Sequence, residues 1–264
     1  MLRIDVVSGS SLFDYIRKKP ILLILCLTVG ALAVNTAAQT TGKNPVIIIP
    51  GVTGSKLVNP NTGKTVWFNI DRDDDDDVRL PITSPILSRN RDSLVADDII
   101  REIKIRALPD VEVYQVLIDA LKAKGYKEGD WKRPEAANVF YVFPYDWRRD
   151  NVETAHILMR RMVAMKRAVR RPGLKFDILA HSMGGLVARY AAMYGLSDLP
   201  RDGATPVPNW SGAAHINKLM MFGTPNEGAF SALDALLNGY PILAGRNLSK
   251  SISRIRISCS TVAA

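Results

Sequence analysis

A serine stands where a buried apolar segment gives way to a helical one. Residues 176–180 are mostly apolar, and the helical segment begins directly after Ser182. Ala180 and Gly184, on either side of the serine, are small, as so tight a strand-to-helix turn requires. Such a turn raises the serine hydroxyl above the sheet and points the helix N-terminus at it. The backbone N–H of Met183 would then face a developing oxyanion. The sequence therefore predicts that Ser182 is a nucleophile.

A less specific interpretation stays open at this point. Ser182 could be the N-cap of a helix that follows an ordinary βα turn. His181 precedes the serine, but a strand side chain does not easily reach back to its neighbour's hydroxyl. We therefore interpret His181 as a packing residue.

A second oxyanion donor should come from the loop after an adjacent strand. The apolar run of residues 46–49 ends at Pro50 and Gly51, and Gly51 allows a close backbone approach. Val52 would then offer its backbone N–H. The alternative is that residues 50–54 form a turn without a catalytic role.

A serine nucleophile also needs a base and an acid that orients the base. In this arrangement they follow the serine in the order acid, then histidine. The one histidine after Ser182 is His215, which precedes a strand and so should lie at the opposite end of the sheet. His156 comes before the serine and is interpreted as a helix-surface residue. We expect the triad acid and histidine to be missing and the chain to be nearly inert.

Hydrophobic patterning predicts an α/β fold built on a mostly parallel sheet. Continuous apolar runs predict strands at residues 46–49, 139–143, 176–180 and 216–222. The first is expected to be buried on both faces, and the last is expected to lie at the edge of the sheet. Helical periodicity predicts helices near residues 113–121, 151–171, 184–194 and 229–237. Residues 51–110 are irregular and too long for a plain loop, so they are expected to be an insertion over the sheet.

Four motifs, in order, resemble the lecithin:cholesterol acyltransferase-like family of α/β-hydrolases. They are Ile49-Pro50-Gly51 with Gly54-Ser55-Lys56-Leu57, Phe143-Pro144-Tyr145-Asp146-Trp147-Arg148, Ala180-His181-Ser182-Met183-Gly184-Gly185 and Gly223-Thr224-Pro225-Asn226-Glu227-Gly228. The Phe-Pro-Tyr-Asp-Trp-Arg string is the more specific match. The motifs cover roughly residues 44–240.

The resemblance implies an α/β-hydrolase fold and a lipase, phospholipase or O-acyltransferase activity. Ser182 would be the nucleophile, and the N–H groups of Val52 and Met183 would form the oxyanion hole. Such enzymes pass an acyl group from a lipid ester to water or to an alcohol. The family also has two further strands that carry the acid and the histidine. We expect this chain to stop before them, since residues 246–264 are basic and serine-rich and do not resemble the family.

Two other charged segments are expected to be structural. Asp146 and Arg148 could form an ion pair that supports the loop around Trp147. The acidic run Asp73–Asp77 lacks the spaced ligands and glycine of a calcium loop, so we interpret it as a solvated loop. We predict no metal site and no cofactor.

The N-terminus has the three parts of a secretory signal. Arg17, Lys18 and Lys19 precede an apolar run over residues 21–34, and a small-residue exit suggests cleavage after Ala38. An uncleaved anchor is the alternative. Cleavage would leave Cys259 without a partner. The expected organisation is a signal at residues 1–38, an incomplete hydrolase domain at 39–245 and an atypical tail at 246–264, with export from the cytoplasm.

The net charge of +9 favours anionic partners but does not choose among them. The basic residues are scattered without interleaved aromatic residues, which argues against nucleic-acid binding. A lipid or ester substrate and a membrane surface are the expected partners. Lipid acyl hydrolysis or transfer is the leading function. A non-catalytic exported lipid- or ester-binding module is the alternative, and a fragment without stable function is a third possibility.

Overall fold

The computed structural model describes residues 42–69, 78, 80, 81, 84, 89–103, 111–200 and 202–230, together with two short strands near the C-terminus. The chain divides into two compact units, Met1–Thr41 and Gly42–Ala264, and every described residue belongs to the second. The expected signal segment and the acidic run Asp73–Asp77 therefore lie outside the described residues.

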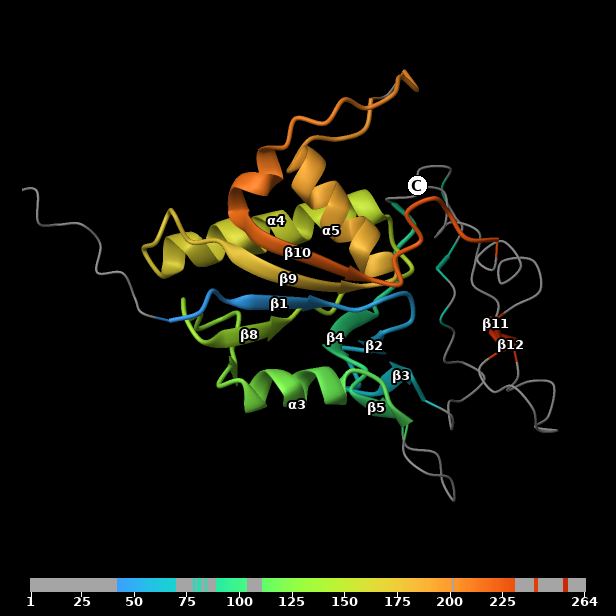
Figure 1. Ribbon diagram of the computed structural model, residues 1–264. Coiled ribbons are helices and arrows are strands. Elements are labelled where there is room, and N and C mark those ends of the chain that lie inside the picture. Colours follow the sequence, from blue (N-terminus) through green and yellow to red (C-terminus); the bar gives the residue numbers. More distant parts are fainter. Residues whose placement is uncertain are drawn as a thin grey trace, which may run out of the picture. The chain divides into compact units, whose positions relative to one another are not determined.

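A five-stranded parallel sheet forms the centre of the second unit (Figure 1). Its order is β10-β9-β1-β8-β7. The bounds are β1 Val46–Ile49, β7 Lys127–Glu128, β8 Val139–Val142, β9 Phe176–His181 and β10 Ile216–Phe222. The four strands expected from apolar patterning are all present, within a residue or so of their predicted bounds. The short strand β7 was not predicted, because Lys127 and Glu128 carry no apolar signal.

Helices cover both faces of this sheet. Helices α4 (Asn151–Ala168) and α5 (Met183–Tyr194) lie on one face and α3 (Gln115–Ala123) lies on the other (Figure 1). The 3₁₀ helix η2, Ser211–His215, leads into β10. The mostly parallel sheet between helices confirms the predicted α/β fold. The helix predicted at 229–237 falls almost entirely outside the described residues.

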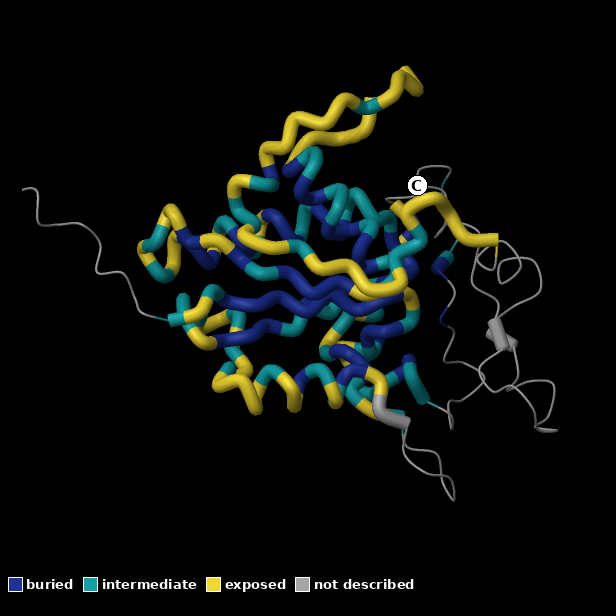
Figure 2. Tube along the Cα trace, viewed as in Figure 1, coloured by how far each residue is buried: buried dark blue, intermediate teal, exposed yellow. Residues whose placement is uncertain are grey.

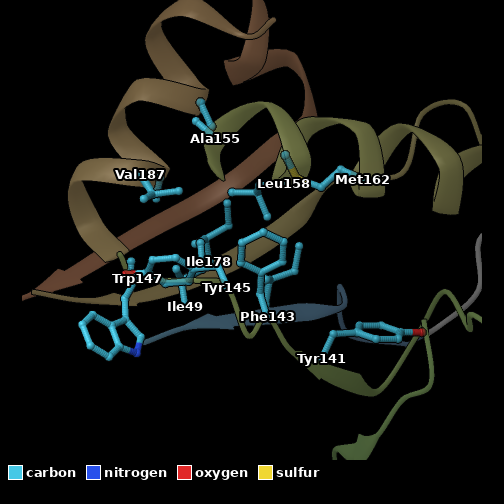
Figure 3. Packing of buried hydrophobic residues seen from close by; sticks show 14 of the residues in the cluster. Ile49, Tyr141, Phe143, Tyr145, Trp147, Ala155, Leu158, Met162, Ile178 and Val187 are labelled. Atoms are coloured by element: carbon cyan, nitrogen blue, oxygen red, sulfur yellow. The ribbon is translucent and has the colours of Figure 1, made fainter. Parts of the chain in front are cut away.

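Alternate residues of the central strands pack in opposite directions. Ile47 and Ile49 belong to the larger core with α4 and α5, whereas Val46 and Ile48 belong to a smaller core with Ile118 of α3. The two cores explain why β1 is apolar at every position. Figure 2 shows the buried central strands, and Figure 3 shows side chains of α4 and α5 over the larger core.

The ends of α4 follow from its sequence. Asp150 is the N-cap, and its side chain accepts a hydrogen bond of 2.6 Å from the Val152 N–H. Glu153 lies in the first turn, and Lys166 and Arg167 lie in the last, where each charge complements the helix dipole. The helix ends at Ala168, three residues before the predicted end.

The segment at 51–110 is more regular than expected. Strands β2 (Ser55–Val58), β3 (Thr65–Trp67) and β4 (Val95–Ile99) form an antiparallel sheet in the order β3-β2-β4. Strands β5 (Glu102–Ile103) and β6 (Val111–Glu112) also pair antiparallel. Short strands with interspersed charged residues lack the alternation that would have predicted the β3-β2-β4 sheet.

Near the C-terminus, β11 (Tyr240–Pro241) and β12 (Arg254–Ile255) form a further antiparallel pair.

A buried ion-pair network joins this segment to the loop after β8. The Arg148 side chain is only 2% exposed. It makes hydrogen-bonded ion pairs with Asp146 at 2.8 Å and with Asp92 at 2.6 Å. It also donates to the Val78 carbonyl oxygen at 3.2 Å. The predicted Asp146–Arg148 pair is present, and Asp92 is a partner that the sequence did not indicate.

Arg148→Ala should lower the free energy of unfolding by about 3–5 kcal/mol, because it leaves two partly buried carboxylates without their cation. Urea denaturation provides the measurement. Arg133→Ala is the matched control: its side chain is 89% exposed and lies 3.5 Å from Asp130. That change should cost less than about 1 kcal/mol. Equal losses in the two variants would contradict a structural role for the Arg148 network.

Candidate active site

Ser182 occupies a strained corner between β9 and α5. Its backbone has φ 50° and ψ −123°, which is unusual for a residue with a side chain. Its N–H donates to the Phe222 carbonyl oxygen at 2.8 Å, and its carbonyl oxygen accepts from the Gly185 N–H at 2.9 Å. The serine is therefore held from both sides, by the end of β10 and by the first turn of α5.

The geometry excludes the simpler interpretation of Ser182 as an ordinary N-cap. An N-cap serine has an extended backbone, and its side chain accepts a hydrogen bond from the first helical turn. Ser182 has a positive φ, and its side chain makes no capping hydrogen bond. Its hydroxyl is thus not committed to the helix end.

Glycines bring the loop of residues 50–54 directly against this corner. A Cβ built on Gly51 would lie 2.9 Å from the Ser182 Cβ, and one on Gly184 would approach the Pro50 carbonyl oxygen closely. Neither contact is one that real Cβ atoms make without a shift. Small residues are therefore required at both positions, on the loop and on the helix.

The loop presents Val52 at its tip. A turn closes the loop through the Gly54 N–H, which donates to the Gly51 carbonyl oxygen at 3.1 Å. Thr53 has a positive φ of 61°. Across the described part of the chain, the backbone N–H groups of Val52 and Met183 donate to no other residue. The structure thus brings the loop and the serine together, while the oxyanion role of the two N–H groups stays a prediction.

Four aromatic side chains hold this loop by hydrogen bonds. Tyr145 Oη donates to the Pro50 carbonyl oxygen at 3.0 Å, and Trp67 Nε1 donates to that of Thr53 at 2.8 Å. Trp147 Nε1 donates to the Ser55 carbonyl oxygen at 3.2 Å. Tyr114 Oη accepts from the Gly51 N–H at 2.8 Å. These roles were not predicted from the sequence, although the Phe-Pro-Tyr-Asp-Trp-Arg string contains two of the residues.

All three histidines of the chain have partners other than the serine hydroxyl. His156 Nε2 lies 3.1 Å from the Ser197 carbonyl oxygen, and its Nδ1 lies 3.8 Å from Asp198. His215 Nδ1 lies 3.1 Å from Lys166 Nζ, and burial together with the Lys166 charge lowers the pKa of His215. The third histidine, His181, contacts Tyr114.

His181 is more than a packing residue. Its Nδ1 lies 2.8 Å from Tyr114 Oη, and the two rings meet edge to face with centroids 5.8 Å apart. Partial burial lowers the pKa of His181. The interpretation from sequence was incomplete, because it considered contacts with the neighbouring serine and not with a residue 67 positions away.

The described residues offer no evident metal site or membrane span. Within them, no group of three or more His, Cys, Asp or Glu side chains is placed to hold a metal ion. None of their helices is both long and apolar enough to cross a membrane.

A helix-flanked parallel sheet with a serine at a strained strand-to-helix corner is the arrangement of the α/β-hydrolase class. The family model for lecithin:cholesterol acyltransferase matches residues 84–257. The chain belongs to the lecithin:cholesterol acyltransferase family. No curated protein matches it.

Gly184→Ala should lower the free energy of unfolding by about 1–3 kcal/mol, because the new methyl group would collide with the Pro50 carbonyl oxygen. Gly173→Ala is the control, since nothing lies within 4 Å of the added Cβ there and its backbone needs no positive φ. That variant should change stability by no more than about 1 kcal/mol. Urea denaturation compares the two, and an unaffected Gly184→Ala would show that the loop does not pack on the corner in solution.

Proposed function

We propose that this protein transfers acyl groups from lipid esters through an acyl-enzyme on Ser182. Membership of the lecithin:cholesterol acyltransferase family supports a lipid acyltransferase or hydrolase. The observation that carries the assignment to a residue is the strained Ser182 corner packed against the loop of residues 50–54. Strain of this kind persists at sites where the backbone conformation serves the chemistry.

The reaction begins when Ser182 Oγ attacks the ester carbonyl carbon and gives up its proton to a base. The carbonyl oxygen becomes an oxyanion, which the N–H groups of Met183 and Val52 stabilise together with the N-terminus of α5. Collapse of this intermediate releases the alcohol and leaves an acyl-serine. Water or a second alcohol then attacks the acyl-serine, giving hydrolysis or acyl transfer.

The base is the missing part of this scheme. His156 contacts Ser197 and Asp198, and His215 contacts Lys166. His181 Nδ1 is hydrogen-bonded to Tyr114. Among the described residues, no hydrogen bond joins a histidine to Ser182. Without a positioned base, an oxyanion hole and substrate binding alone supply only part of the usual acceleration. We therefore propose that this 264-residue chain turns over slowly.

Purified chain should hydrolyse a short-chain aryl ester at well under ~1 per second, the lower end of ordinary enzyme turnover. Ser182→Ala should remove whatever serine-dependent rate exists, with Ser211→Ala as a control at an exposed serine remote from the corner. A rate of roughly 1–1000 per second that Ser182→Ala abolishes would show that a base has been overlooked. His156 would then be the first residue to replace.

A non-catalytic lipid- or ester-binding module is the second candidate, and the absence of a histidine contact to Ser182 favours it. The two functions differ in whether Ser182 becomes acylated. Intact-mass measurement after incubation with an activated ester distinguishes them. A stoichiometric adduct on the wild-type chain that Ser182→Ala lacks supports the nucleophile. Saturable ester binding without an adduct supports the binding module.

Export and contact with a membrane surface belong to the same proposal. The basic, apolar and small residues of positions 17–38 are ordered as in a secretory signal. When the full chain is expressed in a bacterium, the exported product should begin near Gln39. N-terminal sequencing of fractionated cells tests this expectation. A cytoplasmic product that still begins at Met1 would refute it.

A further inference from the structure

Tyr114 lies between the two segments that form the candidate site. Its hydroxyl oxygen is 2.8 Å from the Gly51 N and 2.8 Å from His181 Nδ1. The residue is 6% exposed and stands at the N-cap of α3, on the opposite face of the sheet from α4 and α5. A single buried side chain therefore links the loop after β1 to the end of β9.

The direction of each hydrogen bond follows from the donors available. The Gly51 N–H can only donate, so the tyrosine oxygen accepts from it. Among the described residues, His181 Nδ1 is the one acceptor within hydrogen-bond distance of the hydroxyl. An Nδ1–H donating to the tyrosine oxygen would leave the buried hydroxyl proton without an acceptor, so the hydroxyl donates to Nδ1. A neutral His181 with an accepting Nδ1 carries its proton on Nε2.

Tyr114 and His181 are both kept in the neutral forms that this hydrogen-bond relay, from the Gly51 N–H through Tyr114 to His181, needs. Burial raises the pKa of Tyr114, so its hydroxyl stays protonated. Burial lowers the pKa of His181, so its Nδ1 stays free to accept. Among the described residues, Tyr145 in the segment after β8 also interacts with Tyr114, and burial raises the pKa of Tyr145, so it is neutral as well.

The two residues that the Tyr114 hydroxyl contacts each precede a proposed catalytic residue. Gly51 precedes Val52, and His181 precedes Ser182. The Gly51 backbone lies so close to the corner that an added Cβ would be 3.1 Å from His181 Nδ1. A shift of the tyrosine hydroxyl would therefore remove one hydrogen bond from the loop and one from the histidine ring.

We infer that Tyr114 is a positioning residue that locks the Val52 loop to the Ser182 corner and fixes His181 as the Nε2–H tautomer. This inference rests on the proposed function for its catalytic meaning, but its structural part does not. Protonation of His181 would turn Nδ1 into a donor, and the Tyr114 hydroxyl proton would then lose its acceptor.

Histidine ¹⁵N NMR of the full-length chain tests the structural part with Tyr114→Phe. In the wild type, neutral His181 should be almost entirely the Nε2–H tautomer, with a pKa below about 6.5. In Tyr114→Phe, the tautomers should mix and the pKa should rise toward that value, because the neutral form loses its hydrogen bond. His181→Asn assigns the signal.

Tyr145→Phe is the matched control. It removes a buried hydroxyl that holds the same loop, through Pro50, but leaves the Tyr114–His181 contact in place. Its His181 tautomer should match the wild type. His156 and His215 report on the fold, since unfolding would change all three histidine signals. A folded Tyr114→Phe with an unchanged His181 tautomer and pKa would overturn the inference.

The catalytic part is measured by the rate at which a fluorophosphonate reacts with Ser182, which forms an Oγ–P bond, releases fluoride and passes the serine proton to solvent. Tyr114→Phe should lower the maximal labelling rate by roughly tenfold to a hundredfold with little change in reagent affinity. An unchanged labelling rate would overturn the positioning role. If wild-type Ser182 is not labelled at all, the proposed function fails, and the tautomer measurement alone decides the inference.

Discussion

Parallel pairing between β1 and β9 is the constraint on which the site depends. Ile49 is aligned with Ala180, so the next residues along the chain, Pro50 and His181, emerge side by side. Ligand and catalytic groups in open α/β sheets gather at this carboxyl edge for the same reason. A shift of β1 by one residue would exchange its two buried faces and move Gly51 away from Ser182. The pairing register of β1 with β9 is therefore what sets the position of the loop.

Ion pairs stabilise the segment around Arg148 and Arg149, which follows β8 and whose neighbours Tyr145 and Trp147 hydrogen-bond to the chain after β1. Arg149 pairs with Glu153 at 2.6 Å, and Arg91 lies 3.0 Å from the same carboxylate. Burial alone would raise the pKa of Glu153, but these two arginines outweigh it and lower the pKa below its usual value. A depressed carboxyl pKa contributes stability that is present above the unfolded pKa of about 4.3 and is lost as pH falls through the folded value. The contribution of these ion pairs to stability should thus be lost in acid.

Sequence patterns predicted the parts of the structure that depend on local order. Continuous apolar runs located β1, β8, β9 and β10, and the small residues around Ser182 located the corner. The Tyr114–His181 contact and the Arg148–Asp92 pair escaped prediction because they join residues 67 and 56 positions apart. No periodicity records such partners. They follow from the fold, since the register of the sheet and the placement of α3 decide which side chains meet.

The register of β10 excludes His215 as the base that takes the serine proton. Ile216 pairs with Phe176 and Phe222 pairs with His181, so β10 separates His215 from the Ser182 edge along its full length. At about 3.3 Å per residue, the separation is roughly 20 Å, far beyond any change of rotamer. His215 is also held by Lys166 at the end of α4. The strained backbone of Ser182 nevertheless persists without a capping hydrogen bond to account for it. A strained backbone with an uncommitted hydroxyl favours a site for nucleophilic attack over a simple turn. A base that activates Ser182 must therefore approach it at the carboxyl edge, where the loop of residues 50–54 already lies against the serine.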